Sequence, residues 1–508
     1  MDHRSESPFP EFEEEPVTVG AEAEEGTLPP PKQSGGKRPN RVLNVFLAVM
    51  MALMVAVSAF SLGMIFQQSR ISEEARLMEW IVRVMEEYAI YYDEEEYQEN
   101  LDLLMKNIGT NILMAGVYRA GEGDRFFDVL TPEETAVFLA ENQNRHQGLG
   151  INMPYVSTGP TGDLPVVSNV LGADSPAGRA GLRRYDRLYR LTYAVDAEGE
   201  PVSYDPDAAP AEGGSVKTFG PRDDAGKDLT RSDFLSFFDS FPADVTFSLE
   251  VLRPVQEGET FVYDEEQITR FDGVSLFTYS ADYTDYYDSE TDPELGLDGD
   301  TALIVIKSFD AGASESFAAD METFRQKGKT RLILDLRFNG GGLLTECTAI
   351  ASYLVSDGGS ARTPMAVNVE KKSSSVIMTD QNLYAGMNFG SVAVLANSNS
   401  ASATELLLMA MDYYGTADCI IGSTTYGKGI SQSYFNTRAD FTGFTVKVTV
   451  SQIFNMDYDS RLSLAENAAH TIHGVGISPD VESPDAVCAD YASDPAFRAA
   501  LAYFAGLN

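Results

Sequence analysis

The chain has 508 residues, of which 44% are hydrophobic, and a formal net charge of -40 at pH 7. This length and apolar content allow two or three folded domains. Because so negative a surface repels the phosphate backbone, we expect no nucleic-acid partner. The cysteines, Cys347, Cys419 and Cys488, show neither a disulfide framework nor the spacing of zinc ligands. We therefore predict no metal site and no cofactor.

The N-terminal residues carry signals for placement in the cell. Residues 1–41 are acidic and Pro-rich, which predicts a disordered cytoplasmic tail. Residues 42–66 contain no charge, and as a helix they would span about 37 Å, enough for a bilayer core of roughly 30 Å. Three basic residues at 37–41 precede this segment, so the positive-inside rule predicts a single-pass membrane anchor followed by an extracytoplasmic body. A cleaved signal peptide is the alternative, since residues 57–59 resemble a cleavage site.

Residues 70–145 have the apolar spacing of helices. Trp80, Ile81 and Val84 belong to one apolar stripe, and Leu101, Leu104 and Met105 belong to another. Stripes of this kind pack in a core or a dimer surface more often than they surround a cofactor.

Residues 146–254 form the next module. Gly148-Leu149-Gly150-Ile151 opens it, and alternating apolar residues from Val245 to Val251 close it. This pattern resembles a PDZ domain, whose Gly-rich loop binds the terminal carboxylate of a peptide that adds as a strand to a sheet edge. Residues 194–230 are a Pro-, Gly- and Asp-rich insertion. The alternative for the two glycines is an ordinary β-turn.

Residues 255–482 have the pattern of an α/β core. Continuous apolar runs predict buried strands at 302–306, 332–336, 392–396 and 419–422. Helical spacing places Phe317, Met321 and Phe324 on one buried face, and Cys347, Ile350, Ala351 and Leu354 on another. Residues 444–450 alternate between apolar and polar, which predicts a half-exposed strand. The remaining residues, 483–508, are assigned to a C-terminal tail.

A glycine turn follows the second of these strands, in the stretch Asp335-Leu-Arg-Phe-Asn-Gly-Gly-Gly342. A Gly-rich turn from a strand into a helix offers free backbone N–H groups to an anion, such as the oxyanion of acyl transfer. It could also bind phosphate, but the Lys-Ser/Thr pair of a P-loop does not follow the glycines.

Two further motifs supply a nucleophile and a base. Ser402 lies in Ser400-Ala-Ser-Ala-Thr-Glu405, and Lys428 lies between two glycines, four residues before Gln432. A serine hydroxyl needs a nearby base, and a neutral lysine amine can serve. Read singly, Ser402 is typical of a helix N-cap and Lys428 of a solvated turn.

In this order, together with Gly476-Ile-Ser-Pro-Asp480, the motifs resemble the carboxyl-terminal processing proteases, which are tail-specific serine peptidases with a PDZ domain. The resemblance implies that Ser402 is the nucleophile, Lys428 the general base and Gln432 the residue that orients the lysine. It also implies that the amides of Gly342 and Ala403 form the oxyanion hole. In this family the region before the PDZ domain often joins two protomers, so a homodimer is expected.

The sequence therefore predicts an α/β protease core with a ClpP/crotonase-like parallel sheet and helices, a β-rich PDZ domain and an N-terminal transmembrane helix. The expected activity is that of a serine endopeptidase whose protein or peptide substrates are recognised by their free C-termini. The PDZ loop, Gly148, Leu149, Gly150 and Ile151, is the expected peptide-binding site. Two alternatives remain: a catalytically silent PDZ scaffold, and a Ser-His-Asp esterase using His470 or His473, although Ser402 lacks the Gly-x-Ser-x-Gly elbow.

Overall fold

The computed structural model describes residues 80–81, 83–84, 87–88, 126–130, 132–141, 143–153, 165–221, 229–258, 260–436 and 445–507. The predicted tail at 1–41, the predicted anchor at 42–66 and most of the predicted helical region at 70–145 lie outside these residues. Among the helices that are described, none is long and apolar enough to cross a membrane. Every described residue belongs to one compact unit, within Glu73–Asn508.

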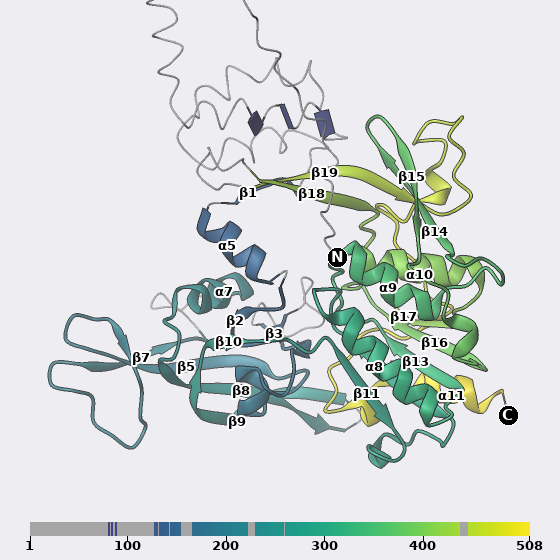
Figure 1. Cartoon of the computed structure of the whole chain (residues 1–508). Coiled ribbons are helices and arrows are strands. Elements are labelled where there is room, and N and C mark those ends of the chain that lie inside the picture. Colours follow the sequence, from purple (N-terminus) through teal and green to yellow (C-terminus); the bar gives the residue numbers. More distant parts are fainter. Residues whose placement is uncertain are drawn as a thin grey trace, which may run out of the picture. The chain divides into compact units, whose positions relative to one another are not determined.

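A six-stranded sheet forms the centre of the α/β domain (Figure 1). Its strands, in spatial order, are β11 (Thr284–Asp288), β12 (Thr301–Ile306), β13 (Arg331–Asp335), β16 (Ser391–Ala396), β17 (Cys419–Gly422) and β20 (Val481–Glu482). All neighbours pair in parallel except β11, which runs antiparallel to β12. The four strands predicted from apolar runs are thus confirmed.

Helices cover both faces of this sheet, which explains why its central strands β12, β13, β16 and β17 are mainly apolar. One face packs against α8 (Ala313–Gln326), α9 (Leu344–Leu354) and α10 (Ala403–Tyr414). The helical faces predicted from spacing are confirmed, because all their residues are fully buried. The other face packs against α11 (Pro495–Ala505) through Phe497 and Phe504. The assignment of residues 483–508 to a tail is therefore wrong: Asp494 caps an amphipathic helix that completes the core.

A second sheet carries the residues that follow Lys428. Its path is β1 (Asp128–Leu130), β19 (Thr445–Phe454), β14 (Pro364–Glu370) and β15 (Ser374–Met378), and β18 (Ile430–Asn436) also pairs with β19. The strand predicted at 444–450 is confirmed for its described residues as part of β19. Its predicted half-exposed pattern is wrong, because Thr445 and Thr449 are as buried as Val446 and Val448. Thr445 is covered by α5 (Pro132–Glu141), whose Thr135 hydroxyl donates to it at 3.0 Å.

The β-rich module has its own hydrophobic core. Its elements are β2 (His146–Gly148), β3 (Ile151–Asn152), β4 (Asn169–Val170), α6 (Pro176–Ala180), β5 (Arg187–Val195), β6 (Pro201–Val202), β7 (Ser215–Phe219), α7 (Arg231–Ser240), β8 (Thr246–Glu257) and β9 (Thr260–Ser275). The described part of the 194–230 insertion includes β6 and β7, which extend the sheet beside β5 (Figure 1).

The boundary predicted at residue 254 is corrected by strand pairing. It falls within β8, whose partner β9 continues to Ser275. Beyond β9, β10 (Phe277–Tyr279) returns to pair with β2 at the start of the module. The sequence did not reveal this because β9 contains many charged residues. They conceal the apolar pattern of a strand that continues the sheet.

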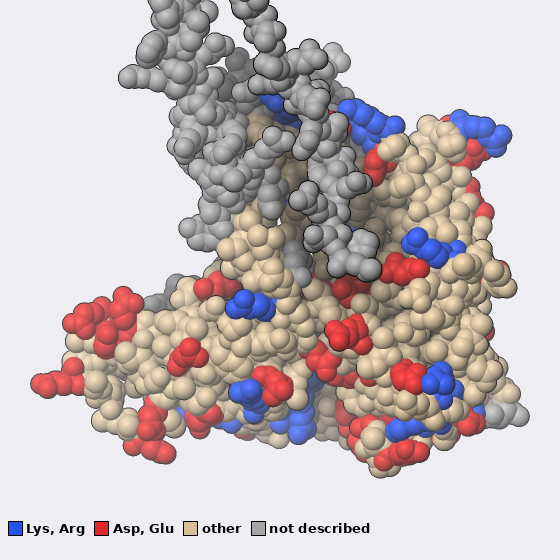
Figure 2. Space-filling model, viewed as in Figure 1, with Lys and Arg blue, Asp and Glu red and all other residues tan. Residues whose placement is uncertain are grey.

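Acidic and basic side chains both lie on the face of the molecule that is in view. Figure 2 shows Asp and Glu scattered over the face in view, with Lys and Arg lying between them. This agrees with the net charge of -40.

Candidate active site

The glycine turn that follows β13 is held in place by Asn339. Its side-chain amide donates to Ile306 O at 2.9 Å, and its Oδ1 accepts the N–H of Gly341 at 2.9 Å. Its carbonyl accepts the N–H of Ala401 at 3.0 Å and the hydroxyl of Thr404 at 2.9 Å. Asn339 is fully buried. The side chain of Asn339 thus joins the end of β12 to the glycine turn, and its backbone carbonyl joins the turn to the segment around Ser402.

Ser402 occupies a strained turn between β16 and α10. Its backbone has φ 62° and ψ -118°, a conformation that costs a non-glycine residue on the order of 1–3 kcal/mol. Such strain persists only where the surroundings impose it, and it is common at functional sites. The N-cap position predicted for an ordinary helical serine is therefore real, but the local conformation is not that of a typical N-cap, which lies in the β region.

The glycine turn and Ser402 lie in direct contact. A Cβ on Gly341 would lie 2.8 Å from Ser402 Cβ and 3.0 Å from Ala403 N, and the φ of Gly341 is +104°. Glycine is therefore required at this position. Among the described residues, no acceptor is found for the N–H groups of Gly342 and Ala403. The two amides proposed for an oxyanion hole thus lie on segments that meet at Ser402.

Glu405 joins the Ser402 turn to the Lys428 loop. Its side chain is fully buried on the first turn of α10. Oε2 accepts the backbone N–H of Ser402 at 3.0 Å and that of Lys428 at 2.7 Å. Oε1 accepts the N–H of Gly427 at 2.7 Å and the Thr425 hydroxyl at 2.5 Å. A buried carboxylate is tolerable only when it is paired or hydrogen-bonded, and these four donors satisfy it.

Lys428 and Gln432 belong to the loop before β18 and to β18 itself. The ammonium nitrogen of Lys428 lies 4.5 Å from the centre of the Phe126 ring, just before β1. The side-chain amide of Gln432 donates to the Thr449 hydroxyl at 3.1 Å, which anchors it to β19. The strands β1 and β18, which follow Phe126 and Lys428, both pair with β19, and Glu405 connects the Lys428 loop to Ser402.

Cys347 lies beneath the site but does not have the character of a nucleophile. Its thiol donates to Ala403 O at 3.3 Å and is fully buried in α9. Burial raises the pKa of the Cys347 thiol to about 12, so the reactive thiolate is scarce at neutral pH.

The residues predicted to bind a peptide carboxylate lie at the edge of the β-rich module. Leu149 O accepts from Ala177 N at 2.8 Å, and Gly150 O accepts from Leu171 N at 2.9 Å. Gly148 belongs to β2 and Ile151 to β3. The loop thus bridges two strands, and it is separate from the segments that meet at Ser402.

A buried ion network links the module to the glycine turn. Arg184 Nη1 donates to Asp335 Oδ2 at 3.0 Å, and Arg337 Nη2 donates to the same oxygen at 2.9 Å. Burial alone would raise the pKa of Asp335, but Arg337 and Arg184 outweigh burial and hold the pKa well below its usual range. Arg337 also pairs with Asp494, the N-cap of α11, at 2.8 Å. The residues before the glycine turn are therefore fixed by the module and by α11 together.

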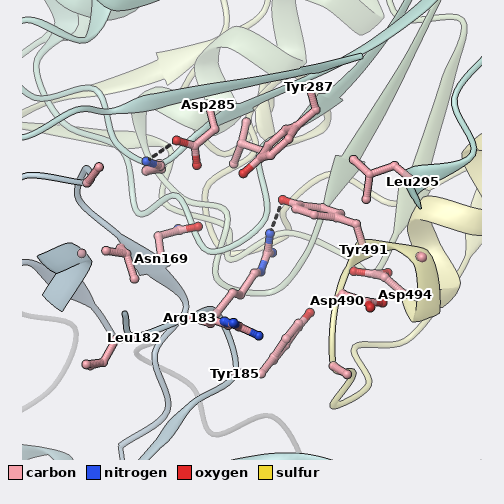
Figure 3. A pocket seen from close by; sticks show the side chains of 18 of the residues that line it. Asn169, Leu182, Arg183, Tyr185, Asp285, Tyr287, Leu295, Asp490, Tyr491 and Asp494 are labelled. Carbon is pink, nitrogen blue, oxygen red and sulfur yellow. Dashed lines mark hydrogen bonds and ion pairs between the residues drawn. The ribbon is translucent and has the colours of Figure 1, made fainter. Parts of the chain in front are cut away.

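A cavity of about 530 Å³ lies beside this network (Figure 3). Figure 3 shows Asn169, Leu182 and Tyr185 of the module on one side, and Tyr287, Leu295 and Tyr491 on the other. Tyr491 OH accepts from Arg184 Nη1 at 2.6 Å. Neither Ser402 nor Lys428 lines this cavity, so it is distinct from the candidate active site.

Sequence reasoning did not identify the role of three residues. Glu405 is the last residue of the Ser402 motif. Its place at the third position of the helix could have indicated that its side chain contacts the backbone of the Ser402 turn. Phe126 and Arg184 gave no signal, because their partners Lys428 and Asp335 are far away in the sequence.

Comparison with known proteins shows what the α/β domain is similar to. Residues 300–483 match Peptidase family S41. A "Probable CtpA-like serine protease" of Staphylococcus epidermidis is 32% identical over 184 residues, which cover 36% of this chain and 33% of that protein. A protein of the same description from Staphylococcus aureus is 26% identical over 359 residues, covering 70% of this chain and 57% of that protein. The chain thus matches between a third and three fifths of these relatives' length.

A solved structure shares the fold over a longer region. The protein, from Bacteroides fragilis, is assigned as an S41 protease, and it superposes with a TM-score of 0.51 at 14% identity, covering 84% of this chain and 97% of that chain. At this identity the likeness shows the fold alone. The family match and the CtpA-like relatives confirm the resemblance stated from the motifs: residues 300–483 of this chain are similar to the peptidases of family S41 and to CtpA-like serine proteases.

Proposed function

We propose that the protein is a membrane-anchored, extracytoplasmic serine endopeptidase that uses Ser402, Lys428 and Gln432. The observation that carries the proposal is the position of Glu405, whose carboxylate binds both the Ser402 turn and the Lys428 loop. The strained backbone of Ser402 and its contact with Gly341 support the same assignment. A peptide-binding scaffold without catalysis would have no need for this strain.

The mechanism follows from these positions. Neutral Lys428 removes the proton of Ser402, whose oxygen attacks the peptide carbonyl, and the amides of Gly342 and Ala403 bind the oxyanion. Lys428 then gives the proton to the leaving amine, and the C–N bond breaks. The neutral lysine then removes a proton from water, whose oxygen attacks the acyl carbonyl. The bond between that carbonyl and the Ser402 oxygen breaks, and the lysine gives the proton to Ser402. Because Thr449 accepts from the amide nitrogen of Gln432, the carbonyl oxygen of Gln432 is left to orient the lysine.

Substrate selection is assigned to the β-rich module as a PDZ domain. The amides of the Gly148–Ile151 loop would bind a free terminal carboxylate, and the peptide would add to a strand edge. Support comes from the loop between β2 and β3. The carbonyls of Leu149 and Gly150 in this loop already accept backbone hydrogen bonds, which hold the turn of the chain in place. Substitution of Gly150 does not test this cleanly, since a Cβ there would lie 2.4 Å from Ser175 Cβ. Amidation of the substrate C-terminus is the better test.

Placement and assembly rest on the N-terminal sequence. The uncharged segment 42–66, preceded by basic residues, supports one membrane-spanning helix with a cytoplasmic N-terminus. The apolar stripes of 70–145 support a homodimer. A tag before Lys37 should be protected from added protease in intact cells.

The activity is tested by incubating an unstructured protein substrate with the wild-type enzyme and with Ser402→Ala, and by sequencing the products by mass spectrometry. We expect internal cleavage by the wild type alone, and at least tenfold slower cleavage of a C-terminally amidated substrate. Peptide binding without any Ser402-dependent cleavage would instead support the silent scaffold. Cleavage that is equal for amidated and free substrates would remove the C-terminus reader while leaving the peptidase.

A further inference from the structure

The ring of Phe126 faces the ammonium of Lys428. The ammonium nitrogen lies 4.5 Å from the ring centre, within the range of a cation–π contact. Phe126 comes from the segment before β1, more than three hundred positions upstream of the lysine by residue number. No motif of the peptidase family match, which spans residues 300–483, includes it.

Strand pairing fixes the segment that carries Phe126. β1 pairs antiparallel with β19, with Asp128 opposite Lys447 and Val129 opposite Val446. β19 pairs in turn with β18, the strand that follows Lys428. The strand that follows Phe126 and the strand that follows the lysine loop thus belong to the same sheet.

A neighbouring apolar cluster anchors the same segment. Phe127 packs against a core formed by Ile81 and Val84 of the N-terminal region and by Val446 and Val448 of β19. This cluster ties the residues before β1 to the sheet. The position of the ring over Lys428 is therefore set by the pairing of β1 and by the packing of Phe127.

A ring and an ammonium attract each other because the face of the ring is electronegative, and this attraction is lost when the amine becomes neutral. A general base must be neutral to accept a proton. The contact therefore favours the form of Lys428 that is unable to act as a base.

We propose that Phe126 is a positioning residue that clamps Lys428 in its protonated resting form, so that the segment before β1 restrains the active site. The part of this proposal that concerns rate rests on the proposed role of Lys428 as base. The contact between the Phe126 ring and the Lys428 ammonium does not depend on that role. Displacement of the ring by substrate would release the lysine toward its neutral form.

Titratable groups lie in the lysine loop and on the elements next to it, and the comparison must leave them unchanged. They are Glu405 from α10, Asp128 from β1, Lys447 from β19, His473 from the segment that contacts Gly429, and Tyr426 within the loop. Variants at position 126 that keep an apolar side chain change none of these charges. A shift in the titration of Lys428 then reports on the ring.

The test measures the pKa of Lys428 directly, by NMR titration of lysine labelled with ¹³C at Cε in the full chain, with the resonance assigned through its loss in Lys428→Arg. Phe126→Leu keeps an apolar side chain but removes the ring. A fluorinated phenylalanine at position 126 keeps the shape and weakens the electronegative face. Phe127→Leu is the matched control, since Phe127 packs in the neighbouring cluster.

We expect the pKa of Lys428 to fall by about 0.5 to 1 unit in both Phe126 variants and to stay unchanged in Phe127→Leu. In the pH profile of kcat/KM this corresponds to a gain of roughly threefold to tenfold on the acidic side. A pKa that is unchanged or higher in the fluorinated protein overturns the clamp, whatever the activity. A lowered pKa with an unshifted rate profile keeps the clamp and counts against Lys428 as the rate-limiting base.

Discussion

The backbone N–H of Lys428 donates to Glu405 Oε2 at 2.7 Å, and the same oxygen accepts the N–H of Ser402. One carboxylate oxygen therefore sets the separation between the segment of the nucleophile and the segment of the base. Because Glu405 is fully buried, its position is fixed by packing as well as by its donors.

Glu405→Gln should impair catalysis more than folding. The amide NH₂ of glutamine is unable to accept a hydrogen bond, so at least one backbone donor would lose its partner and the lysine loop would shift. We expect kcat to fall about 100-fold and the free energy of unfolding to fall by about 1–3 kcal/mol, as for a buried donor left unpaired. Steady-state kinetics and urea unfolding measure the two effects.

Thr425→Val is the matched control for this change. It removes one donor to Glu405 Oε1 and keeps the N–H groups of Ser402, Gly427 and Lys428 on the carboxylate. We expect a loss of no more than about tenfold in kcat. An equal loss in both variants would show that the carboxylate does not position the two segments.

Gly341→Ala should inactivate the enzyme through local crowding. A Cβ there would lie 2.8 Å from both Ala401 O and Ser402 Cβ, and the φ of +104° is already unfavourable for alanine. Gly328→Ala is a control with a positive φ of +65° and no atom within 4 Å of the added Cβ. We expect at least a 100-fold loss of kcat/KM for Gly341→Ala and near-normal activity for Gly328→Ala. Similar activities would mean that the glycine turn does not form part of the site.

Much of this arrangement was readable from sequence because it is local. Buried parallel strands are continuous apolar runs, so β12, β13, β16 and β17 were predicted with nearly their observed bounds. The Ser402 and Lys428 motifs were equally visible, since each is a short run of small residues around one reactive side chain.

The parts that were missed depend on partners far away in the chain. The sequence analysis assigns the C-terminal helix α11 to a tail. The reason for apolar residues at positions 497 and 504 is visible only in the structure, where Phe497 and Phe504 pack on the sheet. The burial of Thr445 and Thr449 depends on neighbouring elements, such as α5 over Thr445, that local alternation does not report. The contacts of Arg184 with Asp335 and of Phe126 with Lys428 likewise arise from tertiary structure alone.

Asp320 should make folding stability depend on pH. Burial, and then the neighbouring carboxylates Asp282 and Asp285, raises the pKa of Asp320 to about 6 from an ordinary value of 3.8. Between these values the folded state holds a proton that the unfolded state has lost, so this group makes the protein less stable as pH rises toward 6. Above pH 6 the cost stays constant.

Asp320→Asn removes that cost. We expect a gain in the free energy of unfolding of about 1–3 kcal/mol at pH 7.5, shrinking through pH 6 and vanishing near pH 4. Glu315→Gln, an exposed change of the same charge on α8, is the control and should leave the pH dependence unaltered. Urea unfolding at several pH values measures it, and a gain that does not depend on pH would contradict the raised pKa.

The most direct test of the Ser402–Lys428 pair is the kinetics of Ser402→Ala, Lys428→Ala and the double variant on one unstructured substrate. Groups that act as a unit lose function together, so we predict that each single change lowers kcat/KM by at least about 1,000-fold and that the double variant is little worse than either. Circular dichroism should show all three folded. Near-normal turnover by folded Lys428→Ala, or losses that multiply in the double variant, would contradict a serine activated by this lysine.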